Sequence, residues 1–214
     1  PNTTNSELFL SLVDLVLTSD PSVSEEVVGK LHQDGTLQCI IDLCGIGEIE
    51  LERYWADKLI VGEKDIKEFP YYGNYVQLTD FELQQIRRHV GLDGKKMLFI
   101  GNGAIPITAI MFKEKQPSLE IRCIDRDMKF VEYAKRILLK LGVSDIYVGN
   151  YDINDLDVLV RSEISNSSIV FIAALVGNSN QQKNLILNNM YPYLSPTSIV
   201  ALRSVPSDMR RILY

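Results

Sequence analysis

The residues best suited to chemistry follow an apolar run, Met97–Ile100, that breaks into a glycine-rich segment. That segment reads Gly101, Asn102, Gly103, Ala104, Ile105, Pro106, Ile107 and Thr108. A buried parallel strand followed by a glycine turn and a helix leaves bare backbone N–H groups at the helix N-terminus, where a nucleotide or an amino-acid carboxylate can lie close. The pattern predicts a cofactor crevice at this turn.

Acidic and small residues end the strands expected further along the chain. Asp125 ends the second strand, at the distance from Gly101 where a carboxylate can accept both hydroxyls of a ribose. Asp127 is a further candidate for the same ligand, and Asp152 follows the third strand, where it either meets an adenine amine or caps a helix. The residues that leave the fourth strand are Ala173, Ala174 and Leu175. They indicate a close approach to a ligand or an ordinary tight strand end.

The glycine segment has the pattern Gly-x-Gly-x-x-Pro rather than Gly-x-Gly-x-x-Gly. Pro106 falls in the first turn of the expected helix, where its missing N–H costs nothing. Without the third glycine the case for a pyrophosphate is weaker, but the glycine turn and the acidic ribose partner remain. A nucleoside without phosphates, such as S-adenosylmethionine, therefore fits these residues better, with a purely structural turn as the alternative.

Two glutamates form a stripe with the tryptophan on an earlier helical segment. Glu48, Glu52 and Trp55 stand at positions i, i+4 and i+7, so they share one helix face. One interpretation is a solvated acidic edge paired with Arg53 or Lys58. The other is a carboxylate held against apolar surroundings, whose raised proton affinity suits a general base.

Aromatic residues crowd together around a proline and a glycine between positions 69 and 75. The segment reads Phe69, Pro70, Tyr71, Tyr72, Gly73, Asn74 and Tyr75, where regular structure is expected to break into a loop. Such a loop forms either a pocket wall or an apolar plug that joins two modules. Thr79–Glu82 then reads as a capping box that starts a helix ending near His89.

The order of the patterns predicts an α/β protein. Residues 6–60 are helical in pattern, with an interruption at Gly45 and Gly47, whereas strands are expected near 96–100, 120–124, 146–148, 169–173 and 199–202. Helices are expected from 105, 128 and about 179. This alternation predicts a Rossmann-like parallel sheet with an N-terminal helical domain. Together with the glycine segment, it favours a sheet of the S-adenosylmethionine-dependent methyltransferase type. We expect domains at 1–92 and 93–214, separated at Gly91–Lys95, and a C-terminal truncation because such sheets commonly finish with further strands.

Composition limits the classes of partner. The 214 residues carry 22 Lys and Arg against 28 Asp and Glu, a net charge of -6, and the basic residues are scattered, which argues against nucleic acid. Three cysteines and two histidines make neither a disulfide framework nor a zinc site. No stretch reaches the roughly 18 apolar residues of a membrane span, and no signal peptide is apparent. We expect a cytoplasmic protein with small-molecule partners, trimmed at its N-terminus because it begins at Pro1.

Several of these stretches together resemble the nicotianamine synthase family. The matching stretches, in the order of the family, are 43–52, the aromatic segment 69–75, the glycine segment 101–108, 173–177 and 202–204. The similarity runs from about Ile40 to Tyr214, and Asn102 departs from it, because relatives often carry a small residue there. The resemblance implies a helical domain capping a Rossmann-like domain that binds S-adenosylmethionine.

The resemblance also implies a reaction and roles for individual residues. The family transfers the aminobutyrate arm of S-adenosylmethionine to an amine and releases methylthioadenosine, with no metal required for catalysis. Glu52 and Tyr75 correspond to the residues that remove the amine proton. Residues expected to contact the acceptor are Glu48, Tyr72, Asn74 and Arg203, the last as a bidentate clamp for a carboxylate. The product is a metal-chelating small molecule, and a homodimer is a further expectation.

Other functions remain open on the sequence alone. A small-molecule methyltransferase would use the same crevice and release S-adenosylhomocysteine. An opine-type metallophore synthase would make one transfer to histidine or another amino acid. A non-catalytic nucleotide-binding module and a nicotinamide dehydrogenase are further alternatives, and the glycine pattern does not favour the dehydrogenase.

Overall fold

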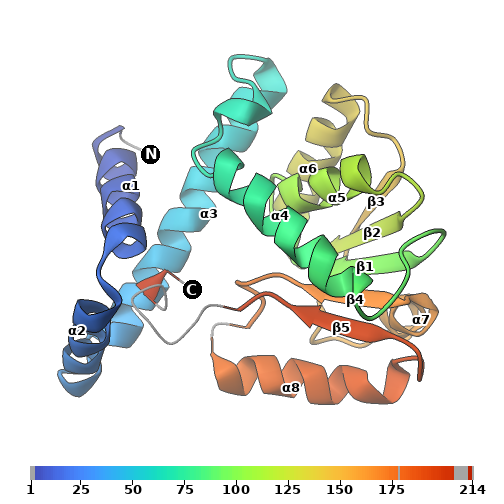
Figure 1. Cartoon of the computed structure of the whole chain (residues 1–214). Coiled ribbons are helices and arrows are strands. Elements are labelled where there is room, and N and C mark those ends of the chain that lie inside the picture. The colour runs from blue at the N-terminus through green and yellow to red at the C-terminus, as the bar shows by residue number, and fades with distance from the viewer. Residues whose placement is uncertain (1–2, 178, 205–211, 214) are drawn as a thin grey trace. The chain divides into compact units, whose positions relative to one another are not determined.

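The computed structural model describes residues 3–177, 179–204 and 212–213. It divides into two compact units, of which one is Trp55–Arg203 and the other comprises the rest of the described chain. Figure 1 shows the elements of both units, and each unit is described by itself. In the part of the chain that the structure describes, no helix combines the length and the apolar character that a membrane span needs.

The larger unit is built on a five-stranded sheet in which all four strand pairs are parallel. Its strands are β1 (Lys96–Ile100), β2 (Glu120–Asp125), β3 (Ile146–Asn150), β4 (Ile169–Ile172) and β5 (Ile199–Leu202). They lie in the order β3-β2-β1-β4-β5, so the chain leaves β1 for one side of the sheet and later returns to its other side at β4. The expected Rossmann-like parallel sheet is confirmed.

Helices cover both faces of this sheet. They are α4 (Tyr72–Arg87), α5 (Ile107–Lys115), α6 (Met128–Lys140), α7 (Val158–Asn166) and α8 (Asn180–Met190), with short 3-10 turns at η1 (Ile66–Glu68) and η2 (Tyr191–Tyr193). Buried residues of α4, α5 and α6 belong to one core cluster with the sheet, and those of α7 and α8 to another. Figure 1 shows α8 on the side of the sheet opposite α4 and α5.

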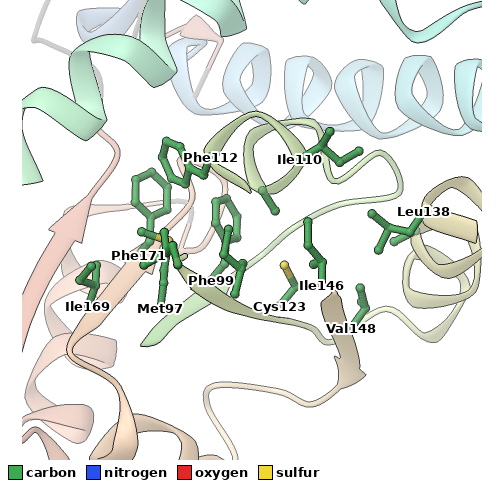
Figure 2. Close-up of a cluster of buried hydrophobic side chains, with 14 of the residues drawn as sticks. Met97, Phe99, Ile110, Phe112, Cys123, Leu138, Ile146, Val148, Ile169 and Phe171 are labelled. Atoms are coloured by element: carbon green, nitrogen blue, oxygen red, sulfur yellow. The ribbon is translucent and has the colours of Figure 1, made fainter. Parts of the chain in front are cut away.

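The two clusters explain the apolar run at β1. Met97 and Phe99 point into the cluster under α4, α5 and α6, whereas Leu98 and Ile100 point into the other. A parallel strand buried on both faces is apolar at every position, because helices cover both sides of the sheet. Figure 2 shows Phe99 together with Phe112 and Phe171; the Phe99 and Phe171 rings stack with centroids 4.8 Å apart, and Phe112 meets Phe171 edge-on at 5.4 Å.

The smaller unit contains α1 (Thr3–Thr18), α2 (Pro21–Gln33) and the first part of α3 (Leu37–Val61). The predicted interruption at Gly45 and Gly47 is wrong, because α3 runs through both glycines without a break. Gly47 lies against the ring of Phe9, and a Cβ at this position would approach the Phe9 Cδ2 atom to 2.8 Å. The glycine is therefore compatible with the helix and makes room for a packed ring rather than ending the helix.

The predicted start of the next helix is also wrong. α4 begins at Tyr72, seven residues before Thr79, so four of the seven residues of the aromatic segment form its first turn and the predicted loop is wrong for them. Thr79 is buried inside the helix, and its Oγ1 donates to the carbonyl oxygen of Tyr75 at 2.7 Å. A threonine hydroxyl satisfied in this way needs no helix terminus, so the Thr79–Glu82 pattern does not cap.

The domain division at Gly91–Lys95 separates the chain by type of secondary structure and stays a prediction. In the structure, Leu83 and Ile86 of α4 and the nearby Leu92 lie in the same core cluster as β1. The helical segment before β1 therefore includes a helix that completes the covering of the sheet.

Candidate functional site

The glycine segment lies at the carboxyl end of β1, beside the carboxyl end of β4. Because the chain leaves β1 and β4 toward opposite sides of the sheet, this is the point where open α/β sheets form their ligand crevice. Gly101 has a φ of 81°, and a Cβ there would come within 2.3 Å of the Val176 Cγ2 atom. A glycine is thus required both by its conformation and by the close approach of the segment that follows β4.

Asp125 ties the glycine turn to the end of β2. Its Oδ2 accepts the N–H of Gly103 at 3.0 Å and its Oδ1 accepts the N–H of Asp127 at 3.0 Å. A carboxylate oxygen has more than one acceptor position, so both oxygens can also accept a hydroxyl. This geometry fits the role of a ribose partner.

The pKa of the Asp125 carboxyl is raised. Burial is the largest cause, and the backbone N–H groups of Asp127 and Gly103 oppose it by stabilising the carboxylate. Two smaller influences oppose each other: the negative charge of Asp127 raises the pKa of Asp125, and the positive charge of Arg126 lowers it. The carboxylate is therefore held in place at some electrostatic cost.

Asn102 presents a buried acceptor at the same turn. The residue is 7% exposed, and its Nδ2 donates to the Gly103 carbonyl oxygen at 2.7 Å, which fixes the orientation of the side-chain amide. Its Oδ1 is buried and accepts no hydrogen bond from the described residues. A buried carbonyl oxygen without a donor is costly, so the turn suits a ligand that brings an N–H or O–H group.

The other predicted cofactor residues have mainly local roles in this structure. Asp127 is the N-cap of α6 and accepts the N–H of Lys129 at 2.8 Å, whereas Pro106 is the N-cap residue of α5 without a side-chain bond. Asp152 accepts the N–H and the side-chain amide of Asn154. It does not cap α7, whose N-cap is Asp157.

A lysine that the sequence pattern did not suggest supports the segment after β4. Lys183 of α8 donates from Nζ to the carbonyl oxygens of Ala174 and Val176. Burial lowers the pKa of this ammonium group. These hydrogen bonds hold the segment that contains the predicted residues Ala173–Leu175 against the start of α8. A single lysine in a helical pattern does not indicate such contacts, so the sequence did not predict them.

The aromatic segment packs against the glycine segment. Phe69 and Ile105 are buried in one apolar cluster, and Tyr72 and Tyr75 pack on it with partial exposure. The ring centroids of Phe69 and Tyr75 are 6.4 Å apart. Asn74 is exposed. The structure therefore brings Tyr72, a predicted substrate contact, and Tyr75, a predicted catalytic residue, next to the turn predicted to bind the cofactor.

Arg203 follows β5 and forms an ion pair with Glu82, the last residue of the predicted capping box. Its Nε and Nη2 each donate to one carboxylate oxygen of Glu82 at 2.8 Å, and Nη2 also donates to the Thr108 Oγ1 at 3.1 Å. The Nε and Nη2 edge of the guanidinium therefore already donates to groups of the protein itself. The role of Arg203 as a clamp for a substrate carboxylate stays a prediction.

Glu48 and Glu52 lie on α3 in the smaller unit, and both are partly buried. Burial raises the pKa of Cys44, one turn before Glu48, and the charge of Glu48 raises it further. The neighbouring ion pairs join Arg53 to Glu50 and Lys58 to Glu63, so these cations have carboxylate partners other than the predicted ones. Among the residues that the structure describes, no group of three or more His, Cys, Asp or Glu could hold a metal ion.

Comparison with known proteins decides the family. The family model described as "Nicotianamine synthase protein" matches residues 1–214. This chain belongs to the nicotianamine synthase family. The resemblance predicted from the glycine and aromatic segments is confirmed.

Plant members of the nicotianamine synthase family are similar along the whole chain. The nicotianamine synthase of Solanum lycopersicum is 27% identical over 215 residues, which cover 97% of this chain and 65% of the plant protein. Nicotianamine synthase 2 of Arabidopsis thaliana is 28% identical over 224 residues, covering 100% and 68%. This chain thus spans about two thirds of the length of these relatives.

Solved structures share the fold. A glutamate-to-glutamine mutant of MtNAS in complex with S-adenosylmethionine superposes with a TM-score of 0.79 at 20% identity, covering 100% of this chain and 79% of that one. MtNAS in complex with MTA and tNA gives a TM-score of 0.77 at 20% identity, covering 98% and 77%. A putative S-adenosylmethionine-dependent methyltransferase from Methanococcus maripaludis gives 0.53 at 13% identity, covering 70% and 62%. The methyltransferase-type fold of this nicotianamine synthase family member is confirmed.

Proposed function

We propose that this chain transfers the 3-amino-3-carboxypropyl (aminobutyrate) arm of S-adenosylmethionine to an amine and releases methylthioadenosine. Membership of the nicotianamine synthase family over residues 1–214 supports the reaction. The observation that carries it is the packing of the aromatic segment, with Tyr75, against the glycine segment, at Ile105. The aromatic segment, which carries proposed acceptor contacts, and the glycine segment, which carries proposed S-adenosylmethionine contacts, are thereby neighbours in one unit.

The residues at the sheet edge fit the nucleoside and the amino acid of S-adenosylmethionine. Asp125 accepts the ribose hydroxyls while Gly103 and Asp127 hold its carboxylate. The unsatisfied Oδ1 of Asn102 accepts an N–H from the bound molecule. Further contacts come from a set of residues at the same strand ends: Gly101, Ile105, Pro106, Asp152, Ala173, Ala174 and Leu175.

The chemistry needs an amine without its extra proton. Glu52, assisted by Tyr75, takes a proton from the ammonium group of the acceptor, which frees the nitrogen lone pair. The nitrogen then bonds to the aminobutyrate carbon attached to sulfur, the carbon–sulfur bond breaks, and its electron pair stays on the sulfur of methylthioadenosine. A sulfonium has three electrophilic carbons, so alignment by the site decides which one reacts.

The acceptor is an amino acid or an aminobutyrate-type amine. We assign its contacts to Glu48, Tyr72 and Asn74, with Arg203 as the candidate carboxylate clamp. The product is a metal-chelating small molecule related to nicotianamine, and no metal is required for catalysis. A cytoplasmic location and a homodimer stay predictions.

The nucleoside product tests the proposal. The protein is incubated with S-adenosylmethionine, alone and with candidate amino acids, and the products are separated by chromatography and identified by mass. Methylthioadenosine supports aminobutyrate transfer, and the mass of the co-product counts the transfers. A single addition to histidine would identify an opine-type metallophore synthase.

A methyltransferase is the second candidate, because the fold is shared with one at a TM-score of 0.53. S-adenosylhomocysteine in the same assay would establish it and would leave Glu52 and Tyr75 without the proposed roles. An unchanged S-adenosylmethionine pool with every acceptor would contradict both enzymes.

A further inference from the structure

Glu82 and Arg203 form a buried, bidentate ion pair inside the larger unit. Their side chains are 11% and 14% exposed, and the two N–H···O contacts are both 2.8 Å. The third contact, from Arg203 to Thr108 Oγ1 at 3.1 Å, adds the first turn of α5. One guanidinium therefore joins α4, the end of β5 and α5, the helix whose first two residues end the glycine segment.

The same guanidinium lies over two aromatic rings. Its carbon is 5.6 Å from the centroid of the Tyr75 ring and 5.3 Å from that of Phe171. Tyr75 and Glu82 are seven residues apart on α4, about 10 Å along the axis and on one face of the helix. The arginine side chain thus bridges the two positions and holds a cation against the tyrosine ring.

We propose that Glu82 is a positioning residue, which holds Arg203 against the ring of Tyr75 and so sets the orientation and the proton affinity of the Tyr75 hydroxyl. The proposal rests on the proposed function, in which Tyr75 helps to remove the amine proton. Glu82 acts through Arg203.

Other charged groups near α4 are engaged in pairs of their own. Lys115 of α5 pairs with Asp80 and also donates to Thr79 Oγ1, and Lys64 pairs with Glu68 of η1. Tyr133 of α6 donates to Asp57. The pair formed by Glu82 and Arg203 is distinguished from these by the ring contact between Arg203 and Tyr75.

The charge balance of the pair predicts the direction in which the ionisation of Tyr75 shifts. Glu82→Gln replaces a carboxylate by a neutral amide of similar shape and leaves the guanidinium uncompensated. A net positive charge beside a phenol stabilises the phenolate, so Tyr75 ionises at lower pH in this variant. The loosened guanidinium also positions Tyr75 less well, and kcat for methylthioadenosine formation is expected to fall on the order of 10-fold.

The experiment uses the full chain and needs two readouts. Ionisation of Tyr75 is followed by ultraviolet difference titration against Tyr75→Phe, without turnover, and the rate of methylthioadenosine formation is measured across pH. The matched control is Asp80→Asn, which breaks the other α4 ion pair, to Lys115, without touching Arg203. Glu82→Asp tests rescue, because it keeps the charge.

The expected result is a lower ionisation pH and a shifted rate profile in Glu82→Gln, with S-adenosylmethionine affinity within about 3-fold of wild type because the nucleoside contacts lie at the sheet edge. Asp80→Asn leaves both readouts unchanged, and Glu82→Asp restores the ionisation pH. Titration curves that superimpose for Glu82→Gln and wild type overturn the proposal, as does an equal shift in Asp80→Asn.

Removing one partner of a buried pair can unfold a protein, whereas replacing both with neutral groups is often tolerated. If Glu82→Gln does not fold, the double variant Glu82→Gln, Arg203→Met replaces it. Tyr75 then ionises at higher pH than in wild type, because the cation on its ring is gone; an unchanged curve overturns the proposal. If wild type makes no methylthioadenosine, the proposed reaction fails, while the titration still decides what Glu82 does to Tyr75.

Discussion

Among the individual residues, Asp125 has a raised pKa, from which we expect folding and the proposed ligand binding to depend on pH in opposite directions. Its folded-state pKa lies above the ordinary value because of burial. Its contribution to stability is therefore fully present below the unfolded pKa and is lost as the pH rises through the folded pKa. In the proposed site the ionised form accepts the two ribose hydroxyls, so the proposed ligand needs the protonation state that is less favourable for folding.

We predict that S-adenosylmethionine affinity falls on acidification from neutral pH before the ordinary aspartate value of 3.8 is reached. The reason is protonation of Asp125 at its raised pKa. Calorimetric titration at a series of pH values measures the effect, and Asp125→Asn is the control, with weak binding that no longer varies in this window. Affinity that stays constant down to the ordinary aspartate range would contradict the assignment of Asp125.

Gly101 is the residue at which backbone conformation and packing act together. We predict that Gly101→Ala lowers the free energy of unfolding by about 1–3 kcal/mol, because the residue has a positive φ and its Cβ would strike Val176. S-adenosylmethionine affinity should fall as well. Urea denaturation measures the stability, and Gly91→Ala is the matched control, since a Cβ there meets nothing within 4 Å. Equal effects at the two glycines would refute the packing argument.

At the scale of elements, α3 carries two glycines that differ in their surroundings. We predict that Gly45→Ala raises the free energy of unfolding by about 1 kcal/mol, because the new Cβ meets nothing within 4 Å and alanine has the better helix propensity. Gly47→Ala should be the less stable of the two variants, because its Cβ would approach Phe9 to 2.8 Å. Thermal unfolding of both variants under one condition measures the difference. Equal stabilisation by both would show that Phe9 does not pack on Gly47.

The elements also show which sequence patterns predicted helix boundaries wrongly. Gly45 and Gly47 and the Thr79–Glu82 pattern are local signals for helix ends, and both were overridden. A glycine costs a helix about 1 kcal/mol, which packing over 25 residues easily offsets. Tertiary contacts, such as the ring of Phe9 on Gly47, decide these cases, and they join segments that lie far apart in the sequence.

At the scale of the whole molecule, binding and catalysis can be separated. We predict that S-adenosylmethionine at 100 times its Kd stabilises the protein by about 2.7 kcal/mol, because it binds the folded state alone. Glu52→Gln should be stabilised by the ligand to the same extent, measured as a rise in Tm. Its rate of methylthioadenosine formation should fall on the order of 100-fold, because the proposed base is gone. Glu50→Gln, on the same helix and paired with Arg53, is the control and should keep its activity. Wild-type turnover in Glu52→Gln would refute the assignment of the base.

The strand, glycine turn and helix at residues 96–108 were predictable from the sequence, as were the strands that follow. These features are encoded locally: both faces of a buried parallel strand are apolar, and glycine adopts a positive φ without strain. The family resemblance depended on the same local segments. Asp125 could be proposed as a ribose partner from the sequence, because its distance from Gly101 follows directly from one strand–helix–strand repeat.

The tertiary structure alone decided which side chains meet. Glu82 and Arg203 are 121 residues apart, and no periodicity within either segment relates them. Likewise, Lys183 reaches the carbonyl oxygens after β4 because α8 folds back against that strand end, and Tyr75 meets the glycine segment because α4 packs on the sheet. Such contacts depend on how whole elements pack, and that is set by the burial of many apolar residues together rather than by the residues that finally touch.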